Sequence, residues 1–298
     1  MGQKQWIKEN TRSLANKLIA ISGATGGLGK MLCRHLASLG ASLILLDRNQ
    51  SRSQALAEAL KQEYPTLSVE RIPLDLEDID SVKAAAEKLL CYPLDALILN
   101  AGAYHIPRRK CKGGYDNVFM INFASPYYLA KKLKPLLDSR GGRLVAVGSV
   151  AHTYSVSDLD DFDFSTRQKH ALCYGNAKRC LMFSLYHVYH GGSTLAITHP
   201  GITVTNITSH YPKLVYMLIK YPMKVIFMHP KKAALSILGG LFDHTNTAEW
   251  IGPRFFSIWG LPKKKALKSY DTEEASRIFQ RAEAIFHELE ALPREENT

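Results

Sequence analysis

The sequence lacks several features that would assign it to a class at once. Its five cysteines are odd in number and include no C-x-x-C pair, which argues against a disulfide framework or a zinc site and favours reduced thiols. No run of about 18 uncharged apolar residues is present, so no transmembrane helix is expected. The N-terminus has no apolar stretch of the length that a secretory signal requires. We therefore expect a cytoplasmic protein without a bound metal.

Acidic residues are scarce over one part of the chain. The 298 residues carry a formal net charge of +11. Between Gly201 and Tyr270 the sequence has ten basic residues and only two acidic ones, Asp243 and Glu249, so this segment alone carries a net charge of +8. A solvated basic face, attraction to anionic lipid and a nucleic-acid patch would each explain the imbalance. Nothing resembles a nucleic-acid-binding module, so no nucleic-acid partner is expected.

Strand-like and helix-like segments alternate from residue 17 to about residue 200. Residues 41–47 are apolar almost throughout, as in a strand that is buried on both faces of a parallel sheet. Six βα units in a row predict an α/β fold, a doubly wound parallel sheet with helices on both faces. No linker or repeat interrupts the pattern, so one domain is expected over 1–298. The expected strands are 17–22, 41–47, 68–74, 95–100, 143–149 and 194–199, and the expected helices between them are 28–39, 51–63, 81–90, 116–137 and 170–190.

The two ends of the chain depart from this alternation. Residues 1–16 are expected to form an N-terminal extension. Residues 206–228 are basic and apolar and interrupt the pattern of strands and helices. A helix is expected near 232–242, and an amphipathic, charge-rich helix over 271–292 closes the chain.

A glycine-rich turn lies where the first strand ends and the first helix begins. It reads Ser22-Gly23-Ala24-Thr25-Gly26-Gly27-Leu28-Gly29. Glycines there let the backbone turn tightly and bring its N–H groups close to a pyrophosphate at the helix N-terminus. A purely local tight turn would use glycines too, but an aspartate, Asp47, stands at the end of the second strand, where a dinucleotide site needs one. A bound dinucleotide is therefore expected.

Asp47 and Arg48 bear in opposite directions on the choice of dinucleotide. Asp47 should accept hydrogen bonds from the adenosine ribose and repel a 2′-phosphate, because two like charges about 4 Å apart cost roughly 4 kcal/mol at an effective dielectric constant of 20. Arg48 could pair with that phosphate or stack on the adenine. The carboxylate stands at the strand end itself, so NAD is favoured over NADP as the cofactor.

Three side chains suggest proton-transfer chemistry. Tyr174 and Lys178 stand four residues apart on one expected helix, hence on the same face. A phenol has a pKa near 10, and a nearby cation would lower that pKa toward the working range. A Tyr–Lys pair alone is common by chance, but Ser149 ends the fifth expected strand. Ligands bind at the carboxyl ends of parallel strands, so we expect the three side chains to face one cleft.

Further motifs follow the glycine turn and accompany the Ser-Tyr-Lys set: Leu74-Asp75-Leu76, Asn100-Ala101-Gly102, Asn122, and Pro200-Gly201 with Thr205. Together these six motifs, in this order, resemble the short-chain dehydrogenase/reductase family, from about residue 17 to residue 206. The resemblance implies a single Rossmann-type domain and catalytic roles for Ser149, Tyr174, Lys178 and Asn122. Ser149 would orient the substrate oxygen, Tyr174 would exchange its proton, Lys178 would hold the ribose, and Asn122 would complete a proton relay. Two departures are small: Ser22 stands where the family usually has Thr, and Gly148 where many members have Ser.

The same resemblance implies the residues that contact the cofactor, in addition to Asp47, Arg48, Tyr174 and Lys178. They lie in the glycine turn, in the motifs that follow the third and fourth strands, and in the Pro-Gly motif that follows the sixth. These residues are Gly23, Gly27, Leu28, Gly29, Asp75, Leu76, Asn100, Ala101, Gly102, Pro200, Gly201 and Thr205.

Finer details are similar to the retinol-dehydrogenase-like branch of the family: the 25-residue gap between Ser149 and Tyr174, and His152 and His199 beside the motifs. This implies a hydrophobic alcohol or carbonyl substrate, such as a retinoid, a steroid or an aliphatic compound. Residues 206–228 then correspond to the family's substrate loop. Their apolar part, 214–228, suits either a lid or peripheral contact with a membrane interface, and a core helix is the plainer alternative. The family also implies a homo-oligomer.

Two further functions compete with an oxidoreductase. A catalytically silent protein could bind the dinucleotide as a signal, but such a protein needs only the cofactor half of the motifs. A sugar-nucleotide epimerase shares the Tyr and the Lys but has a larger architecture and a different glycine spacing. The intact set of catalytic motifs favours an NAD(P)-dependent oxidoreductase.

Overall fold

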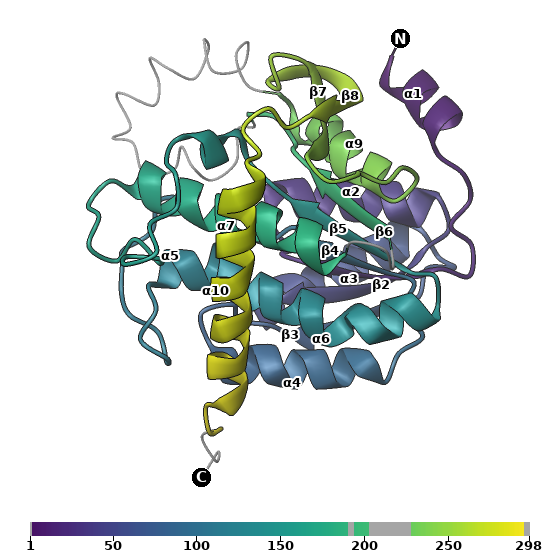
Figure 1. Ribbon diagram of the computed structural model, residues 1–298. Coiled ribbons are helices and arrows are strands. Elements are labelled where there is room, and N and C mark those ends of the chain that lie inside the picture. Colours follow the sequence, from purple (N-terminus) through teal and green to yellow (C-terminus); the bar gives the residue numbers. More distant parts are fainter. Residues whose placement is uncertain (1, 190–193, 203–227, 295–298) are drawn as a thin grey trace, which may run out of the picture.

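Eight strands form one twisted sheet at the centre of the protein, in the order β3-β2-β1-β4-β5-β6-β7-β8 (Figure 1). The computed structural model describes residues 2–189, 194–202 and 228–294. Strands β1 to β7 run parallel, and β8 pairs antiparallel with β7. The strands are β1 (Leu18–Ser22), β2 (Ser42–Asp47), β3 (Val69–Pro73), β4 (Ala96–Leu99), β5 (Arg143–Val147), β6 (Thr194–Thr198), β7 (Glu249–Phe255) and β8 (Trp259–Ala266).

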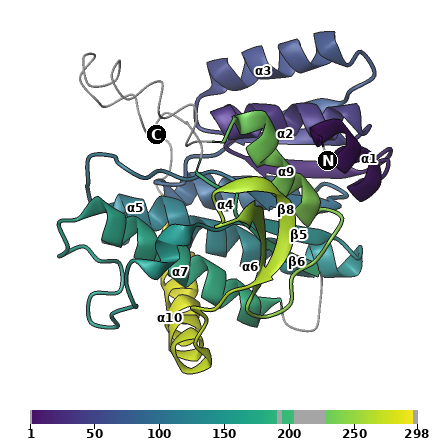
Figure 2. The same ribbon diagram turned by 90° about the horizontal axis from the view of Figure 1, so that it is seen from above.

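Helices cover both faces of the sheet (Figure 2). One face packs against α1, α2, α3 and α9, and the other against α4, α6, α7 and α10. The helices are α1 (Gln3–Asn10), α2 (Gly27–Ser38), α3 (Gln50–Glu63), α4 (Ile79–Leu90), α5 (Asn117–Phe119), α6 (Ser125–Ser139), α7 (His170–Val188), α9 (Pro230–Gly240) and α10 (Thr272–Ala291). The expected doubly wound α/β architecture is therefore confirmed.

Alternate side chains of the central strands enter two separate cores. Leu43 and Leu45 of β2 join the core beneath α2 and α9, whereas Ile44 and Leu46 join the core beneath α4 and α6. All four side chains are almost completely buried. This two-sided burial is why residues 41–47 are apolar without alternation.

The structure adds elements that the sequence pattern did not reveal. Strands β7 and β8 extend the sheet beyond the six expected strands, and the last pair is antiparallel, so the sheet is not wholly parallel. Residues 263–265 are three consecutive lysines on the edge strand β8. Charged residues on an edge strand interrupt the alternation of apolar and polar residues by which a strand is recognised. The N-terminal extension contains the helix α1, whose Trp6 is 5% exposed and packs over Gly239.

The long helix expected over 116–137 is divided by a π-helical turn, Met120–Ala124, between α5 and α6. Asn122 lies in this turn, and its Nδ2 donates to the carbonyl of Val118 at 2.8 Å. A side chain that competes for a helix carbonyl is one of the ordinary causes of such a π-bulge. The turn places the Asn122 side chain at the edge of the sheet where the site lies.

Candidate active site

The predicted site residues gather at the carboxyl-terminal edge of the sheet. Because β1 to β6 are parallel, the residues at the ends of these strands lie along one edge. Asp47 ends β2, Asn100 follows β4, Ser149 follows β5 by two residues, and Pro200 follows β6 by two. Ligands of doubly wound sheets bind at this edge.

The glycine turn is shaped by close backbone contacts. Gly23 has a φ of +67°, and a Cβ on Gly29 would lie 2.3 Å from the carbonyl oxygen of Gly23. A Cβ on Gly27 would meet nothing within 4 Å, so the backbone there is open to a ligand. Gly26, the N-cap of α2, provides no side-chain cap, and the first turn of α2 has no acidic residue. The open N–H groups fit the pyrophosphate of a dinucleotide.

The carboxylate of Asp47 is held by the protein itself. Its Oδ1 accepts the backbone N–H of Thr25 at 2.9 Å and the Thr25 hydroxyl at 2.8 Å, and its Oδ2 accepts the Ser53 hydroxyl at 3.1 Å. Asp47 is only 2% exposed. The residue lies where a ribose contact needs it, but three protein donors already occupy its oxygens.

Arg48, in contrast, extends into solvent among carboxylates. Its side chain is 64% exposed. Its Nη1 pairs with Glu77 Oε1 at 3.1 Å, and its Nε lies 4.0 Å from Asp75 Oδ2. Glu77 also pairs with Arg109. The Arg48 charge is therefore already compensated by two acidic neighbours.

The ends of β1 and β4 are joined by a short polar network. The Ser22 hydroxyl accepts the N–H groups of Asn100 at 3.0 Å and Ala101 at 3.1 Å. Asn100 Nδ2 donates to the carbonyls of Ser22 and Gly23. Asn100 Oδ1 is buried and has no hydrogen-bond partner in the described structure. The network fixes the glycine turn against the Asn-Ala-Gly motif, as the cofactor prediction requires.

The Asp75-Leu76 motif follows β3 at the carboxyl-terminal edge of the sheet. Asp75 Oδ1 accepts the N–H of Glu77 at 3.0 Å, so the carboxylate is turned into its own loop. The carbonyl of Leu76 accepts the hydroxyl of Ser125 at 2.7 Å, at the start of α6. The Ser125 contact holds the loop that follows β3 against the start of α6.

Ser149 and Tyr174 lie on the same side of the sheet, with the Ser149 hydroxyl near enough to the Tyr174 phenol to act on its pKa. Ser149 is the N-cap of a short 3₁₀ helix, Val150–Thr153, and its hydroxyl accepts the N–H of Ala151 at 3.2 Å. The Tyr174 residue is only partly buried, but its phenol oxygen is surrounded by protein. That burial raises the pKa of Tyr174 to about 12, although the nearby Ser149 side chain acts to lower it.

Lys178 lies close to Tyr174. The Lys178 Nζ donates to the carbonyl of Val147 at 2.9 Å and lies 5.9 Å from the centre of the Tyr174 ring. Burial lowers the pKa of Lys178 itself to about 8. Burial is the largest cause of the raised Tyr174 pKa, and the neighbouring phenols of Tyr104 and Tyr154 add to it. In the chain by itself the net shift of the Tyr174 pKa is upward, because burial outweighs the neighbouring groups, and the lowering of this pKa by Lys178 stays a prediction.

Asn122 ties the π-helical turn to the loop after β4. Its Oδ1 accepts the N–H of Ala103 at 3.2 Å, and its Nδ2 donates to the Ala103 carbonyl at 2.7 Å. A Cβ on Gly102 would lie 2.9 Å from Asn122 Oδ1 and 3.6 Å from Lys178 Nζ. Glycine at this position thus brings Asn122, Lys178 and the backbone together.

The Pro200-Gly201 motif also needs its glycine. Gly201 has a φ of +82°, and a Cβ there would lie 2.7 Å from the carbonyl oxygen of Ile258. Thr205 lies outside the described residues. The same holds for the expected substrate loop 206–228 and its apolar part 214–228, apart from Met228.

Several residues that frame the site were not predicted. Tyr104 packs edge-on against the Tyr174 ring at 5.2 Å between ring centres. Arg179 pairs with Glu274 of α10, although the two are far apart in sequence. Tyr104 lies two residues beyond the Asn-Ala-Gly motif, a position from which an aromatic side chain could have been suspected. Nothing in the sequence pairs Arg179 with Glu274.

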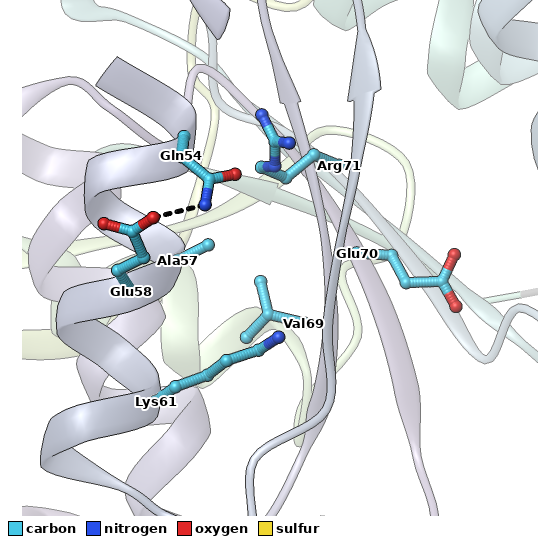
Figure 3. Close-up of a pocket in the computed structure, with 7 residues that line it drawn as sticks. All are labelled: Gln54, Ala57, Glu58, Lys61, Val69, Glu70 and Arg71. Atoms are coloured by element: carbon cyan, nitrogen blue, oxygen red, sulfur yellow. Dashed lines mark hydrogen bonds between the residues drawn. The ribbon is translucent and has the colours of Figure 1, made fainter. Parts of the chain in front are cut away.

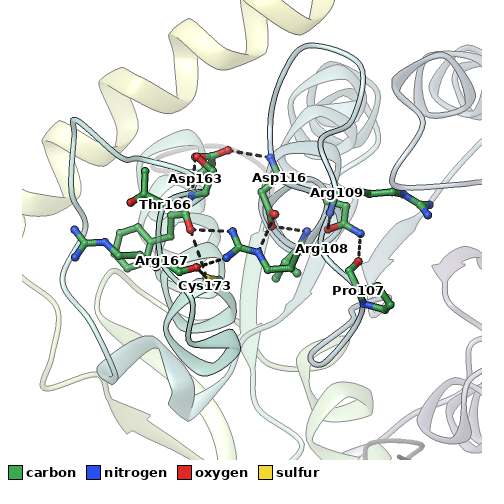
Figure 4. A network of polar contacts seen from close by, with 12 residues as sticks. Pro107, Arg108, Arg109, Asp116, Asp163, Thr166, Arg167 and Cys173 are labelled. Carbon is green, nitrogen blue, oxygen red and sulfur yellow. Dashed lines mark hydrogen bonds and ion pairs between the residues drawn. The ribbon is translucent and has the colours of Figure 1, made fainter.

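The loop before α7 is held by a second polar network (Figure 4). Arg108 Nε donates to Asp116 Oδ2 at 2.9 Å, and the N–H of Asp116 donates to Asp163 Oδ2 at 2.9 Å. Cys173 contacts the carbonyls of Phe164 and Arg167. Asp163 in this loop therefore stabilises the local structure by accepting a backbone N–H. Among the described residues no group of three or more His, Cys, Asp or Glu side chains could hold a metal ion.

A separate groove lies between α3 and β3, away from the predicted chemistry (Figure 3). Its lining mixes acidic and basic side chains, and Gln54 bonds Glu58 across one helical turn. No catalytic-motif residue contributes to it. It lies along the β3 edge of the sheet, and its charges suit a solvated edge strand. Its lining residues are Gln54, Ala57, Glu58, Lys61, Val69, Glu70 and Arg71.

Comparison with known sequences gives a consistent set of relatives. A sequence profile for short chain dehydrogenases matches residues 17–159. Human retinol dehydrogenase 14 is 30% identical over 293 residues, which cover 90% of this chain and 86% of that protein. Human polyprenol dehydrogenase is 27% identical over 65% of this chain and 63% of its own length. The short chain dehydrogenase rstn4 of Aspergillus nomiae is 37% identical over 48% of this chain and 42% of its own length. The matched regions thus cover less than two thirds of the last two relatives.

Solved structures share the fold. A crystal structure of an uncharacterized protein from Mycobacterium paratuberculosis has a TM-score of 0.74 at 23% identity, covering 94% of this chain and 96% of its own. L-sorbose reductase from Gluconobacter frateurii, solved with NADPH and L-sorbose, has a TM-score of 0.60 at 19% identity, covering 78% of this chain and 91% of its own. At these identities the likeness concerns the fold alone. None of the described helices is both long and apolar enough to span a bilayer.

Proposed function

The chain belongs to the short-chain dehydrogenase/reductase family, and on that premise we propose that it transfers a hydride between a nicotinamide cofactor and a hydrophobic alcohol or carbonyl compound. The observation that carries the proposal is the convergence of three side chains at one edge of the sheet: the Ser149 hydroxyl is near enough to the Tyr174 phenol to act on its pKa, and Lys178 Nζ lies 5.9 Å from the centre of the Tyr174 ring. A protein that only senses the dinucleotide would not need this arrangement on the substrate side.

The pKa of Tyr174 favours the phenol as a proton donor. With a pKa raised to about 12, the Tyr174 phenol is protonated at neutral pH and can donate its proton to an alkoxide that forms during reduction. Ser149, whose hydroxyl lies near the same phenol, is placed to orient the substrate oxygen. Lys178, with a pKa lowered to about 8, is placed to bind the ribose. The bound nicotinamide supplies the hydride in reduction and accepts it in oxidation.

NAD remains the favoured cofactor, because of Asp47 and also because of the ion pairs that Arg48 forms. Arg48 is the residue that could bind a 2′-phosphate, but its guanidinium already pairs with Glu77 and Asp75. Together with Asp47 these carboxylates leave the adenosine side of the site with an excess of negative charge. A 2′-phosphate would have to compete with these two carboxylates for the guanidinium of Arg48, and Glu77 also holds that of Arg109.

A hydrophobic substrate is supported by the side chains near Tyr174. The ring of Tyr104 packs on that of Tyr174, and Tyr154 is 53% exposed at the end of the 3₁₀ helix after Ser149. Two relatives are named for lipid-like alcohols, retinol and polyprenol. We therefore extend the proposal to alcohols and carbonyls of that class, with retinoids, steroids and long aliphatic compounds as the first candidates.

Three predictions about the setting of the enzyme accompany the proposal. All five cysteines are free, which suits the cytoplasmic location expected from the sequence. Self-association is expected from the family. Contact with a membrane surface is expected from the excess of basic charge and from the apolar segment 214–228.

The proposal is tested by fluorescence titration with NADH and NADPH, followed by a panel of retinoid, steroid and aliphatic alcohols and carbonyls with the preferred cofactor. Turnover of a hydrophobic member is the expected result. A protein that binds the cofactor but turns over no member of the panel would instead be the dinucleotide-responsive binding protein.

A further inference from the structure

The hairpin that joins β7 and β8 carries three exposed aromatic side chains at its tip. Phe255 is 56% exposed, Phe256 84% and Trp259 38%. We call these three residues the aromatic tip. Scattered single apolar residues on a surface are ordinary, but three large aromatic ones on one turn form a patch.

The backbone of the turn is unusual for these residue types. Phe256 has a φ of +48° and Ser257 a φ of +57°, both in the left-handed region. The turn consists of the three residues 256–258, between the paired residues Phe255 and Trp259, and positive φ values favour Gly and Asn because other side chains are strained there. The sequence therefore places a phenylalanine where it strains the backbone and also exposes an apolar ring to water. Strained residues of this kind are concentrated at functional positions.

The aromatic tip lies at the same edge of the sheet as the candidate active site. Strand β7 runs parallel to β6, so its carboxyl end reaches the edge where Ser149 lies. The Ser257 carbonyl is 3.1 Å from Nε2 of His199, and the carbonyl of Ile258 lies against Gly201. The tip is thus attached directly to the loop that is expected to contact the nicotinamide.

Positive charge accompanies the aromatic tip. The guanidinium of Arg254 lies 5.7 Å from the centre of the Phe255 ring, and Lys263 on β8 is exposed. The one acidic residue of the hairpin, Glu249, stands at the opposite end of β7 and accepts the N–H of Asn246. The whole chain carries a net charge of +11. Aromatic rings beside cations suit the boundary between an anionic lipid headgroup layer and the acyl chains.

We propose that the aromatic tip docks on an anionic membrane surface and thereby sets the active-site edge of the sheet against the lipid. The inference deepens the proposed function and rests on it, because an enzyme for lipid-like alcohols would take its substrate directly from the bilayer at this edge. The docking surface consists of Arg254, Phe255, Phe256 and Trp259. A second protein molecule is the competing occupant, but the accompanying positive charge on a strongly basic chain favours lipid, since two copies of the chain would repel each other.

The test is co-sedimentation of the full chain with vesicles of phosphatidylcholine alone or of equal parts phosphatidylcholine and phosphatidylserine, without cofactor or substrate. Wild type should bind the anionic vesicles more strongly, and salt should weaken the binding. The variant F255S/F256G should bind at least about tenfold more weakly, since two rings that insert at the interface are lost. Phe256→Gly also relieves the backbone strain, so the loss cannot be attributed to an unfolded hairpin.

Leu90→Ser is the matched control. Leu90 is 43% exposed at the end of α4, immediately before β4, and so lies at the opposite, amino-terminal edge of the sheet. This variant should bind vesicles as wild type does. Equal binding by wild type and F255S/F256G, or no binding by wild type, would overturn the proposal. So would a dimer in sedimentation velocity that F256G dissociates, because the tip would then be a protein contact.

The same assay separates this inference from the proposed function. The inactive variant Tyr174→Phe should bind vesicles like wild type, since Tyr174 is not part of the aromatic tip. If wild type binds vesicles through the tip but turns over no alcohol or carbonyl, the docking surface stands and the oxidoreductase assignment fails. If a short, water-soluble alcohol is oxidised while F255S/F256G binds vesicles like wild type, the assignment stands and the docking surface fails.

Discussion

Arg179, the residue directly after Lys178, forms a buried ion pair with Glu274 in the first turn of α10. Its Nε donates to Glu274 Oε1 at 2.7 Å, and the two side chains are 5% and 9% exposed. The same guanidinium donates to the carbonyl of His152 at 3.0 Å, and the His152 ring is 2.6 Å from the carbonyl of Ser149. The C-terminal helix is therefore linked through two residues to the backbone of the catalytic-motif serine.

This pair gives a prediction for stability. Glu274→Gln leaves Arg179 buried without its counter-charge, and breaking a buried pair from one side costs about 3 kcal/mol or more. We expect the free energy of unfolding, measured with urea, to fall by about that amount. Glu273→Gln is the control, because Glu273 pairs with Arg277 at an exposed i,i+4 position and should change stability by less than about 0.5 kcal/mol. Equal effects of the two substitutions would show that the buried pair is not stabilising.

Tyr174→Phe should abolish turnover and leave cofactor affinity largely intact. The substitution removes the hydroxyl that donates the proton, a loss of about 10² to 10⁴-fold in kcat for a general acid. Steady-state kinetics with the best substrate of the panel and fluorescence titration of the reduced cofactor measure the two quantities. Tyr104→Phe is the control, since it retains the ring that packs on Tyr174 and should retain most of the activity. Undiminished kcat in Tyr174→Phe would refute the proposed catalytic role.

Cofactor preference should respond to Glu77. Wild type is expected to bind NADH more tightly than NADPH. Glu77→Gln frees the guanidinium of Arg48 from its closest carboxylate, so the ratio of NADPH affinity to NADH affinity should rise by about two- to fivefold, as for an exposed ion pair. Glu58→Gln removes an equal charge in the α3 groove and should leave the ratio unchanged. Parity between the two cofactors in wild type would contradict the interpretation of Asp47 and Arg48.

The lowered pKa of Lys178 predicts a dependence of stability on pH. With a folded-state pKa of about 8 and an ordinary pKa near 10.5, the folded chain loses the proton first. Between these values the unfolded chain binds more protons, so stability rises with pH. Below about pH 8 the full cost of burying the charge, about 3 kcal/mol, is present. Urea unfolding from pH 7.5 to 9.5 should show a steeper rise for wild type than for Lys178→Met, and parallel curves would show that burial does not shift this pKa.

Motif residues at strand ends were predictable because their chemistry depends on local sequence order. The turn at Gly23 and Gly29 requires glycine for reasons visible in two adjacent elements, and the i,i+4 spacing of Tyr174 and Lys178 fixes their common helix face. The strand β8 was missed, because its lysines and its place at the edge of the sheet remove the apolar period on which such predictions depend. The upward shift of the Tyr174 pKa was not predicted, because a pKa depends on burial and on distance, and spacing along a helix gives neither.

The sequence by itself determined the alternation of strands and helices from β1 to β6, the family, and the motif residues that stand at the ends of these strands. These follow from periodicity and from motifs a few residues long, within which the chain's own geometry leaves little freedom. Only the tertiary structure decided that Asp47 is held by Thr25 and Ser53, that Arg179 meets Glu274, and that an aromatic hairpin tip adjoins the site. Each of these joins segments distant in sequence, and their contact is set by packing of the whole sheet with its helices, which no local pattern encodes.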